Sequence, residues 1–173
     1  MWWRLKRSEW SKGKGDANRR AFRNVVQHGE PPGLLAYSGR DPVGWIAIAP
    51  RETYPGLGRS RILKPLDDRP VWSVTCFFVG RPFRRQGVTV ELLKAAAKYA
   101  RGRGAKMLEG YPSEPGSGTV ADAWVYTGLA GAFRRAGFRE AARPSPRRPI
   151  MRLALGAGPP RRRSPRAGAS SKL

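Results

Sequence analysis

The sequence predicts an α/β (α+β) domain with a mixed, mostly antiparallel central sheet, a β-α-β core and flanking helices. An apolar run over 71–79, an amphipathic segment over 87–101 and a second apolar run over 106–111 predict the core. In the segment 87–101, apolar residues recur at helical spacing and the basic residues turn outward. Strand, helix and strand in this order normally form a right-handed crossover with parallel strands.

The N-terminal elements are predicted from capping and turn residues. Residues 16–28 are expected to form a helix, with Asp16 as a plausible N-cap and Gly29 as its stop. The apolar runs 33–37 and 43–49 flank a segment rich in turn-forming residues, which predicts a β-hairpin.

The remaining segments complete the expected domain. Residues 50–70 contain several prolines and glycines and are expected to form a long irregular loop, a type of segment that often binds ligands. A second helix is expected over 123–136, and closing strands over 138–142 and 150–155. The polar segment 156–173 is rich in proline, glycine and arginine and is expected to be a disordered tail.

The formal net charge is +22. Residues 143–173 contain nine Lys and Arg and no Asp or Glu, so residues 1–142 carry 25 minus 12, or +13. The predicted domain, 1–155, is therefore strongly basic without its tail, which favours phosphate-rich ligands or nucleic acid. A general solubilising bias in composition is an equally open explanation.

Several classes of site are excluded by residue counts. Cys76 is the only cysteine and His28 the only histidine, so an internal disulfide, a Cys/His metal centre and a Ser-His-Asp triad lack the necessary residues. There is no run of about eighteen apolar residues, and the first residues lack the apolar core of a signal peptide. The expected location is cytoplasmic, with no membrane partner.

The segment 77–89 predicts an anion site. An apolar strand ends, a short basic loop follows, and a helix begins. The first N–H groups of a helix have no intrahelical partner and lie at its positive end. Arg84 and Arg85 add charge, and Gly87 allows a ligand to approach the backbone closely. A phosphate or pyrophosphate is the expected ligand.

The segment Arg84-Arg85-Gln86-Gly87-Val88-Thr89 resembles the strand-to-helix signature of the GNAT N-acetyltransferases. That signature is an arginine or glutamine, two residues, glycine, one residue, then glycine or alanine. Downstream, Phe133-Arg134-Arg135-Ala136-Gly137-Phe138 resembles the family's aromatic-x-x-x-Gly-Phe segment. The resemblance covers about residues 34–155, including the order of elements.

The resemblance implies acetyl-CoA as acetyl donor, an amine acceptor and direct attack of the amine on the thioester, without a metal. The implied pyrophosphate site comprises Arg84, Arg85, Gln86, Gly87, Val88 and Thr89. The implied strand that pairs with the cofactor and polarises its thioester comprises Phe77, Phe78 and Val79, next to a bulge. The acceptor is either a small molecule or a protein.

The sequence departs from the family pattern at three places. Thr89 replaces a small residue, and Phe133 occupies the position of the tyrosine that often protonates the departing sulfur. Tyr126, two helical turns earlier, is a possible substitute, although a core or rim tyrosine is the simpler interpretation. Only residues 1–28 precede the first hairpin, so either the first edge strand is lacking or residues before Met1 are absent.

A general base should be a carboxylate near the splayed strand. Glu109 on the second core strand and Glu52 at the start of the long loop are the candidates, and an ordinary salt bridge is the alternative interpretation of each. Asp67 and Asp68 form an adjacent acidic pair that is either solvated or attractive to a cationic amine.

A second functional hypothesis is a nucleic-acid- or ribosome-associated protein on a GNAT-like fold. Trp2, Trp3 and Trp10 lie among lysines and arginines, a pattern that can stack bases and neutralise phosphates. They are equally suited to dock the N-terminal segment onto the core or onto a partner subunit, so a homodimer is also open. The basic tail is a further candidate contact for nucleic acid.

Overall fold

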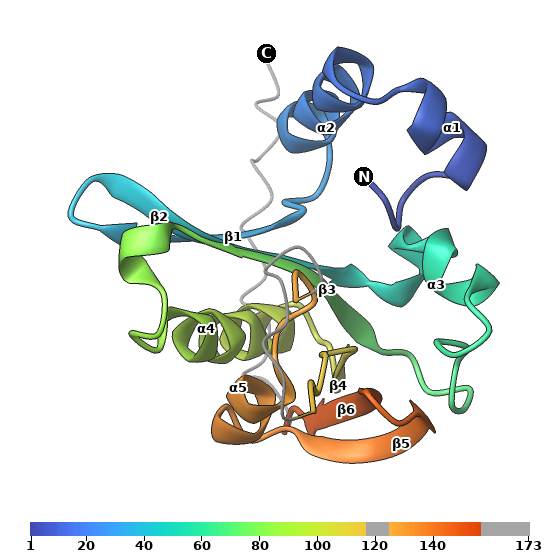
Figure 1. Ribbon diagram of the computed structural model, residues 1–173, viewed down its shortest axis with the longest axis vertical. Helices are drawn as coiled ribbons and strands as arrows, with labels where there is room; N and C mark the ends of the chain where they lie inside the picture. The colour runs from blue at the N-terminus through green and yellow to red at the C-terminus, as the bar shows by residue number, and fades with distance from the viewer. Residues whose placement is uncertain (117–124, 157–173) are drawn as a thin grey trace, which may run out of the picture.

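The computed structural model describes residues 1–116 and 125–156 of the chain. The strands are β1 (Gly33–Ser38), β2 (Asp41–Pro50), β3 (Trp72–Val79), β4 (Met107–Gly110), β5 (Arg139–Ser145) and β6 (Arg148–Ala154). Within the described residues they form one six-stranded sheet in the order β1-β2-β3-β4-β6-β5 (Figure 1). Neighbouring strands are antiparallel except β3 and β4, which are parallel. The predicted fold class is confirmed.

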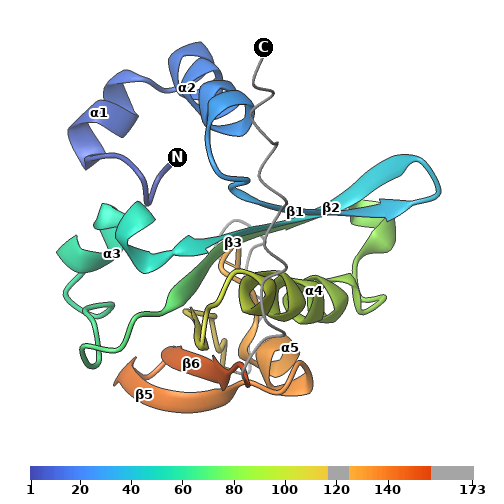
Figure 2. The same ribbon diagram turned by 180° about the vertical axis from the view of Figure 1, so that it is seen from behind.

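The helices are α1 (Arg7–Lys12), α2 (Asp16–His28), α3 (Pro55–Arg59), α4 (Val88–Gly102) and α5 (Ala130–Arg135), with 3-10 turns η1 (Arg51–Thr53) and η2 (Arg81–Phe83). Helices α4 and α5 lie on one face of the sheet, and α1 and α2 on the other, as both views show (Figures 1 and 2). We call these the α4 face and the α2 face.

Alternation along the strands divides the apolar residues between two clusters. Ile46, Val74 and Phe77 point to the α4 face, where they pack with Leu93 and other residues of α4 and with Phe133 of α5. On the α2 face, a smaller cluster joins α3 to the sheet. Its buried members are Ala49, Tyr54, Leu57, Leu63, Tyr111 and Ile150. The sheet is therefore covered on both sides near the start of β3.

The prediction of a helix over 123–136 was wrong in its first part. Helix α5 begins at Ala130, and Leu129 before it is extended. Gly128 has a φ of +88°, and its carbonyl accepts a hydrogen bond from the Ser113 amide at 2.8 Å. This hydrogen bond between distant segments stabilises the non-helical conformation of residues 125–129. Residues 117–124 lie outside the described part of the chain, as does the predicted tail from 157 onward.

Three smaller expectations were also wrong. The long loop over 50–70 contains η1 and α3. Gly15, not Asp16, is the N-cap of α2. Helix α1 was not predicted, because it has no apolar periodicity; its first turn is closed by the amide of Lys6, which donates to Glu9 Oε2 at 3.0 Å. Within the described residues, α1 and α2 precede β1 and no strand does.

Candidate active site

The central feature of the site is a divergence between β3 and β4. In the pairing of β2 with β3, Ala47 lies opposite Cys76 and Ile48 opposite Val74, so Thr75 is the extra residue of a β-bulge. Strand β3 pairs with β4 over three residues, of which Val74, opposite Gly110, is the last. Beyond these two residues the parallel strands separate, and the last five residues of β3 border a gap.

Backbone groups of β3 face this gap. The Gly80 amide donates to the Val43 carbonyl of β2 at 2.9 Å. Since successive N–H groups along a strand point to opposite sides, the amides of Val79 and Phe77 point away from β2. The Phe77 amide donates to the Tyr126 carbonyl at 2.6 Å. The Val79 carbonyl accepts from Arg84 Nε at 3.0 Å, which fixes the following loop to the strand.

The loop between β3 and α4 has the geometry of an anion site. Arg85 and Gly87 have φ values of +62° and +83°, whereas Gln86 between them does not have a positive φ. When residues of positive and negative φ alternate, successive backbone N–H groups point into one concavity, which can bind an anion. Gly87 is the N-cap of α4, so the unpaired amides at the positive end of a 15-residue helix follow directly. The predicted residues of the loop are thus brought together at one end of the gap.

Segment 125–129 closes the gap on one side. Gly128 packs between two rings: a Cβ built there would lie 2.9 Å from Phe77 and 2.9 Å from Phe133. Phe133 is fully buried, and its ring contacts Phe77 edge-on at 5.9 Å. Phe133 therefore belongs to the core. The backbone carbonyl of Tyr126 is at the gap, and Tyr126 precedes α5 instead of lying on one of its faces, as the helical spacing predicted. Partial burial raises the pKa of its phenol.

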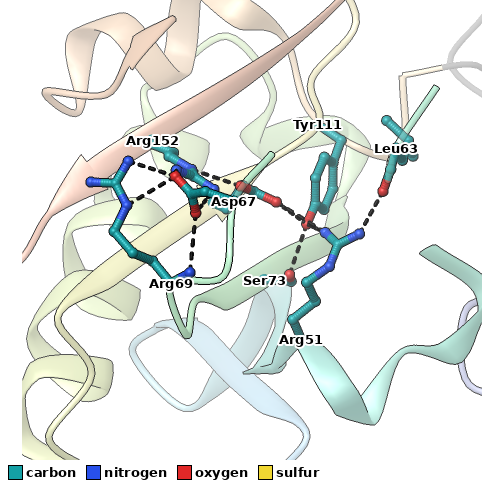
Figure 3. Close-up of polar contacts among 8 residues, drawn as sticks. Arg51, Leu63, Asp67, Arg69, Ser73, Tyr111 and Arg152 are labelled. Atoms are coloured by element: carbon teal, nitrogen blue, oxygen red, sulfur yellow. Dashed lines mark hydrogen bonds and ion pairs between the residues drawn. The ribbon is translucent and has the colours of Figure 1, made fainter. Parts of the chain in front are cut away.

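Glu109 lies next to the point of divergence, inside a network of ion pairs on the α2 face. Its carboxylate is fully buried and contacts Arg51 Nη1 at 3.0 Å and Arg152 Nε at 2.7 Å. It also accepts from the Tyr111 hydroxyl at 2.7 Å. Arg152 continues to Asp67 at 2.7 Å (Figure 3). Two guanidinium groups thus compensate the buried carboxylate.

The network extends to both core strands. The Tyr111 hydroxyl lies 2.8 Å from Ser73 Oγ on β3 (Figure 3). Burial, then the charge of Glu109, raises the pKa of Tyr111. Hydrogen bonds from Arg152 and Arg69 lower the pKa of Asp67. Sequence reasoning missed Arg51 and Arg152, because nothing local marks arginines that meet a glutamate 58 and 43 positions away.

Glu52 lies at the opposite end of β3 from the gap. It is exposed on η1, after the last residue of β2, and lines a pocket of about 260 Å³ with Asp68 and Arg152. The adjacent acids Asp67 and Asp68 both line this pocket, and they differ in that Asp67 is paired with arginines whereas Asp68 has no ion pair within the described residues. A second cavity of about 430 Å³ lies between the C-terminal ends of α2 and α4, with Trp72 and Tyr99 in its wall.

The N-terminal tryptophans pack on one another. Trp2 contacts Trp10 and Trp3 edge-on, with ring centroids 4.9 Å and 6.3 Å apart. Trp3 packs against the α3 cluster, and its carbonyl accepts from the Gly56 amide at 2.9 Å. Docking of this segment onto the core, one of the two predicted alternatives, is thus observed.

In residues 1–116 and 125–156, no group of three or more His, Cys, Asp or Glu is placed to hold a metal ion. No helix in the same part of the chain has the length and apolarity needed to cross a membrane. Cys76 on β3 is partly buried, and this burial raises the pKa of its thiol.

Comparisons with known proteins agree with the geometry. The sequence model of the acetyltransferase (GNAT) family matches residues 1–116. A GNAT-family acetyltransferase from Listeria monocytogenes is similar in structure, with a TM-score of 0.52, 12% identity, and coverage of 87% of this chain and 77% of that one. A GNAT-family protein from Desulfovibrio desulfuricans has a TM-score of 0.52, 17% identity, and coverage of 85% and 89%. The comparison with curated proteins finds no match. At these identities the structures establish the fold alone.

Proposed function

The chain belongs to the acetyltransferase (GNAT) family, and on that premise we propose that it transfers an acetyl group from acetyl-CoA to a primary amine by direct attack. The observation that carries the proposal is the gap between β3 and β4, which opens next to the loop 84–89. A strand edge that could pair with the extended arm of a ligand therefore lies next to a basic loop that could bind the phosphates of the same ligand. Acetyl-CoA has both parts.

The chain's residues fit the phosphate end of this cofactor. Arg85 is exposed in the loop, and a Cβ at Gly87 would meet nothing within 4 Å, so the backbone is open to a ligand there. The amides at the start of α4 supply further donors, and Thr89 adds a hydroxyl. We assign Arg84 to the shape of the loop, because its guanidinium is bonded to the Val79 carbonyl.

At the other end of the cofactor, the strand edge supplies donors for the thioester. When bound, acetyl-CoA supplies an acyl group that is already activated. The Val79 amide faces the gap, and the Phe77 amide reaches a thioester carbonyl only if its bond to Tyr126 opens. Backbone donors in such positions stabilise the negative charge that develops on a carbonyl oxygen during attack.

For proton transfer we propose separate roles for the candidates. The backbone of Tyr126 is at the gap, and partial burial raises the pKa of its phenol, which therefore stays protonated at neutral pH, so Tyr126 is the proposed donor to the leaving thiolate. Glu109 is the candidate base nearest the gap, but both of its carboxylate oxygens are held in ion pairs with arginines. Glu52 is less hindered and farther away. We therefore propose Glu109 before Glu52 as the general base. The alternative is that Glu109 only positions Tyr111 and the two arginines.

Calorimetry with acetyl-CoA and a thiol-release assay with a panel of primary amines test this function. We expect acetyl-CoA to bind, with weaker binding of CoA analogues that lack the pyrophosphate. Thiol release should occur with a subset of amines. A folded protein that binds no acetyl-CoA would contradict the proposal. If acetyl-CoA binds but no amine of the panel causes thiol release, the cofactor site would be supported and only the tested amines would be excluded as acceptors.

A further inference from the structure

A row of apolar side chains crosses the α2 face of the first three strands. Leu35, Trp45 and Phe78 lie directly opposite one another on β1, β2 and β3. Tyr37 follows on β1 after a register shift. The residues that alternate with them pack against the α4 core, so these four side chains point to the opposite face. We call Leu35, Tyr37, Trp45 and Phe78 the aromatic row.

Most of this row is open to solvent. Leu35 is 51% exposed, Tyr37 59% and Phe78 61%. Only Trp45, in the middle of the row, is covered, by an edge-on contact with Phe22 of α2 at 6.1 Å. In Figure 2 the β1–β2 hairpin extends past α2 with no helix above it on this side. The exposed rings of Tyr37 on β1 and Phe78 on β3, with Leu35 beside them, lie on either side of the covered Trp45 and form an exposed apolar surface. Monomeric proteins rarely leave such a surface without a function.

Positive charge borders the row along α2. Asn18 binds the Trp10 carbonyl of α1 at 2.9 Å, so one flank of α2 faces α1. Helical spacing from Phe22 places Arg19 and Arg23 on the other flank. Both views show the hairpin on the side of α2 away from α1 (Figures 1 and 2). Both arginines are exposed, and neither has an ion pair within the described residues.

We propose that the aromatic row and the arginine flank of α2 bind single-stranded nucleic acid. Rings exposed on a sheet stack unpaired bases, and cations beside them neutralise the phosphates that connect those bases. A chain with a net charge of +22 attracts such a polyanion over long range. A second copy of this chain is a poorer occupant, because its own α2 arginines would meet those of the first copy.

This surface is distinct from the phosphate loop, and the proposal does not depend on acetyl transfer. The loop lies at the N-terminus of α4, whereas the arginine flank belongs to α2 on the other face. The two anion sites would therefore be occupied at the same time. Saturating acetyl-CoA should leave the affinity for an oligonucleotide within about twofold.

Fluorescence anisotropy of a labelled 12-nucleotide oligo(dT) with the full chain tests the proposal. Tyr37→Ala should weaken binding about tenfold, since one base loses its stacking partner. Arg19→Gln with Arg23→Gln should weaken binding and reduce the salt dependence, by about 0.7 in the logarithmic slope for each lost phosphate contact. A duplex of equal length should bind more weakly than the single strand at the same salt concentration.

Matched controls separate this surface from general charge attraction and from the basic tail, which every variant retains. Lys98→Gln with Arg101→Gln removes two exposed cations from α4 on the opposite face. Equal losses in the two double variants, or no loss in Tyr37→Ala, would overturn the proposal. Equal affinity for the duplex would also overturn it. Sedimentation of the free protein tests the alternative occupant: a dimer that Tyr37→Asp dissociates would assign the row to a second copy.

Discussion

The backbone amide of Phe77 donates to the carbonyl of Tyr126 across the gap between β3 and β4, at 2.6 Å. This bond joins the strand that would present the thioester to the segment that carries the proposed proton donor. It holds Tyr126 beside the bulged part of β3 although α5 begins only at Ala130. A ligand carbonyl that approaches Phe77 therefore competes with the chain's own backbone.

The first prediction concerns the Tyr126 hydroxyl. Tyr126→Phe should lower kcat about a hundredfold, because a positioned acid for the leaving thiolate is lost. The affinity for acetyl-CoA should not change, since the backbone bond to Phe77 is retained. Thiol-release kinetics and calorimetry measure the two quantities.

Tyr99→Phe is the matched control for Tyr126. Tyr99 is another tyrosine whose pKa burial raises, but it lies near the C-terminal end of α4, against Trp72. Its variant should keep the wild-type kcat. Equal kcat values for Tyr126→Phe and the wild type would remove Tyr126 from the mechanism.

The sequence was sufficient for elements whose signals are local. The apolar run of β3, the periodicity of α4 and the breakers between them lie within about thirty residues, so β3 and α4 were predicted together with the loop that joins them; the 3-10 turn η2 inside it was not. The prediction of a helix over 123–136 was wrong for residues 125–129, because Gly128 within this segment is hydrogen-bonded to the distant Ser113. Helix propensity predicts a segment's conformation poorly where contacts with distant residues determine it.

The candidate site was predictable in part for the same reason. The loop 84–89 is contiguous, and its anion geometry follows from its own backbone. Glu109 was identified as a carboxylate on the right strand, but its environment depends on Arg51 and Arg152, which the sheet brings to it from other strands or turns. The aromatic row was not recognised, because its members come from three strands and become neighbours only through register.

The second prediction concerns Gly87. Its φ of +83° is a conformation that costs an alanine about 1 kcal/mol or more. Gly87→Ala should weaken acetyl-CoA binding about tenfold, because the loop amides move from their concave arrangement. Gly104→Ala is a close control: Gly104 has a φ of +85° and equally open surroundings, but follows the C-terminus of α4.

We expect the two glycine variants to lose similar stability in urea unfolding. Only Gly87→Ala should lose affinity for acetyl-CoA in calorimetry. If both variants bind as the wild type does, the phosphate loop is assigned to the wrong segment.

The third prediction concerns the buried carboxylate. Glu109→Gln should lower the free energy of unfolding by about 3 kcal/mol, since Arg51 then lacks its counter-charge and Arg152 keeps only Asp67. Adding Arg51→Met should recover part of that loss, because the guanidinium that has lost its counter-charge is removed. Urea unfolding of the single and double variants measures this coupling.

Turnover separates structure from catalysis at the same residue. If Glu109 is the base, kcat of Glu109→Gln stays low at every pH. If it only positions Tyr111 and the two arginines, the variant keeps a wild-type pH profile at reduced stability. Glu52→Gln should leave stability unchanged, because Glu52 is exposed.

The fourth prediction concerns pH and Asp67. Hydrogen bonds from Arg152 and Arg69 hold the pKa of this carboxyl well below its ordinary value in the folded protein. A group with a lowered folded pKa stabilises the fold above its unfolded pKa, about 3.9 for Asp, and that contribution is lost as the pH falls below it. Asp67→Asn should therefore lower Tm at pH 7, and the difference from wild type should shrink below about pH 4. Asp68, the next residue, has no ion pair within the described residues, so Asp68→Asn should leave Tm unchanged at pH 7 and at pH 3. A Tm difference for Asp67→Asn that is as large at pH 3 as at pH 7 would show that its arginine contacts do not depend on charge.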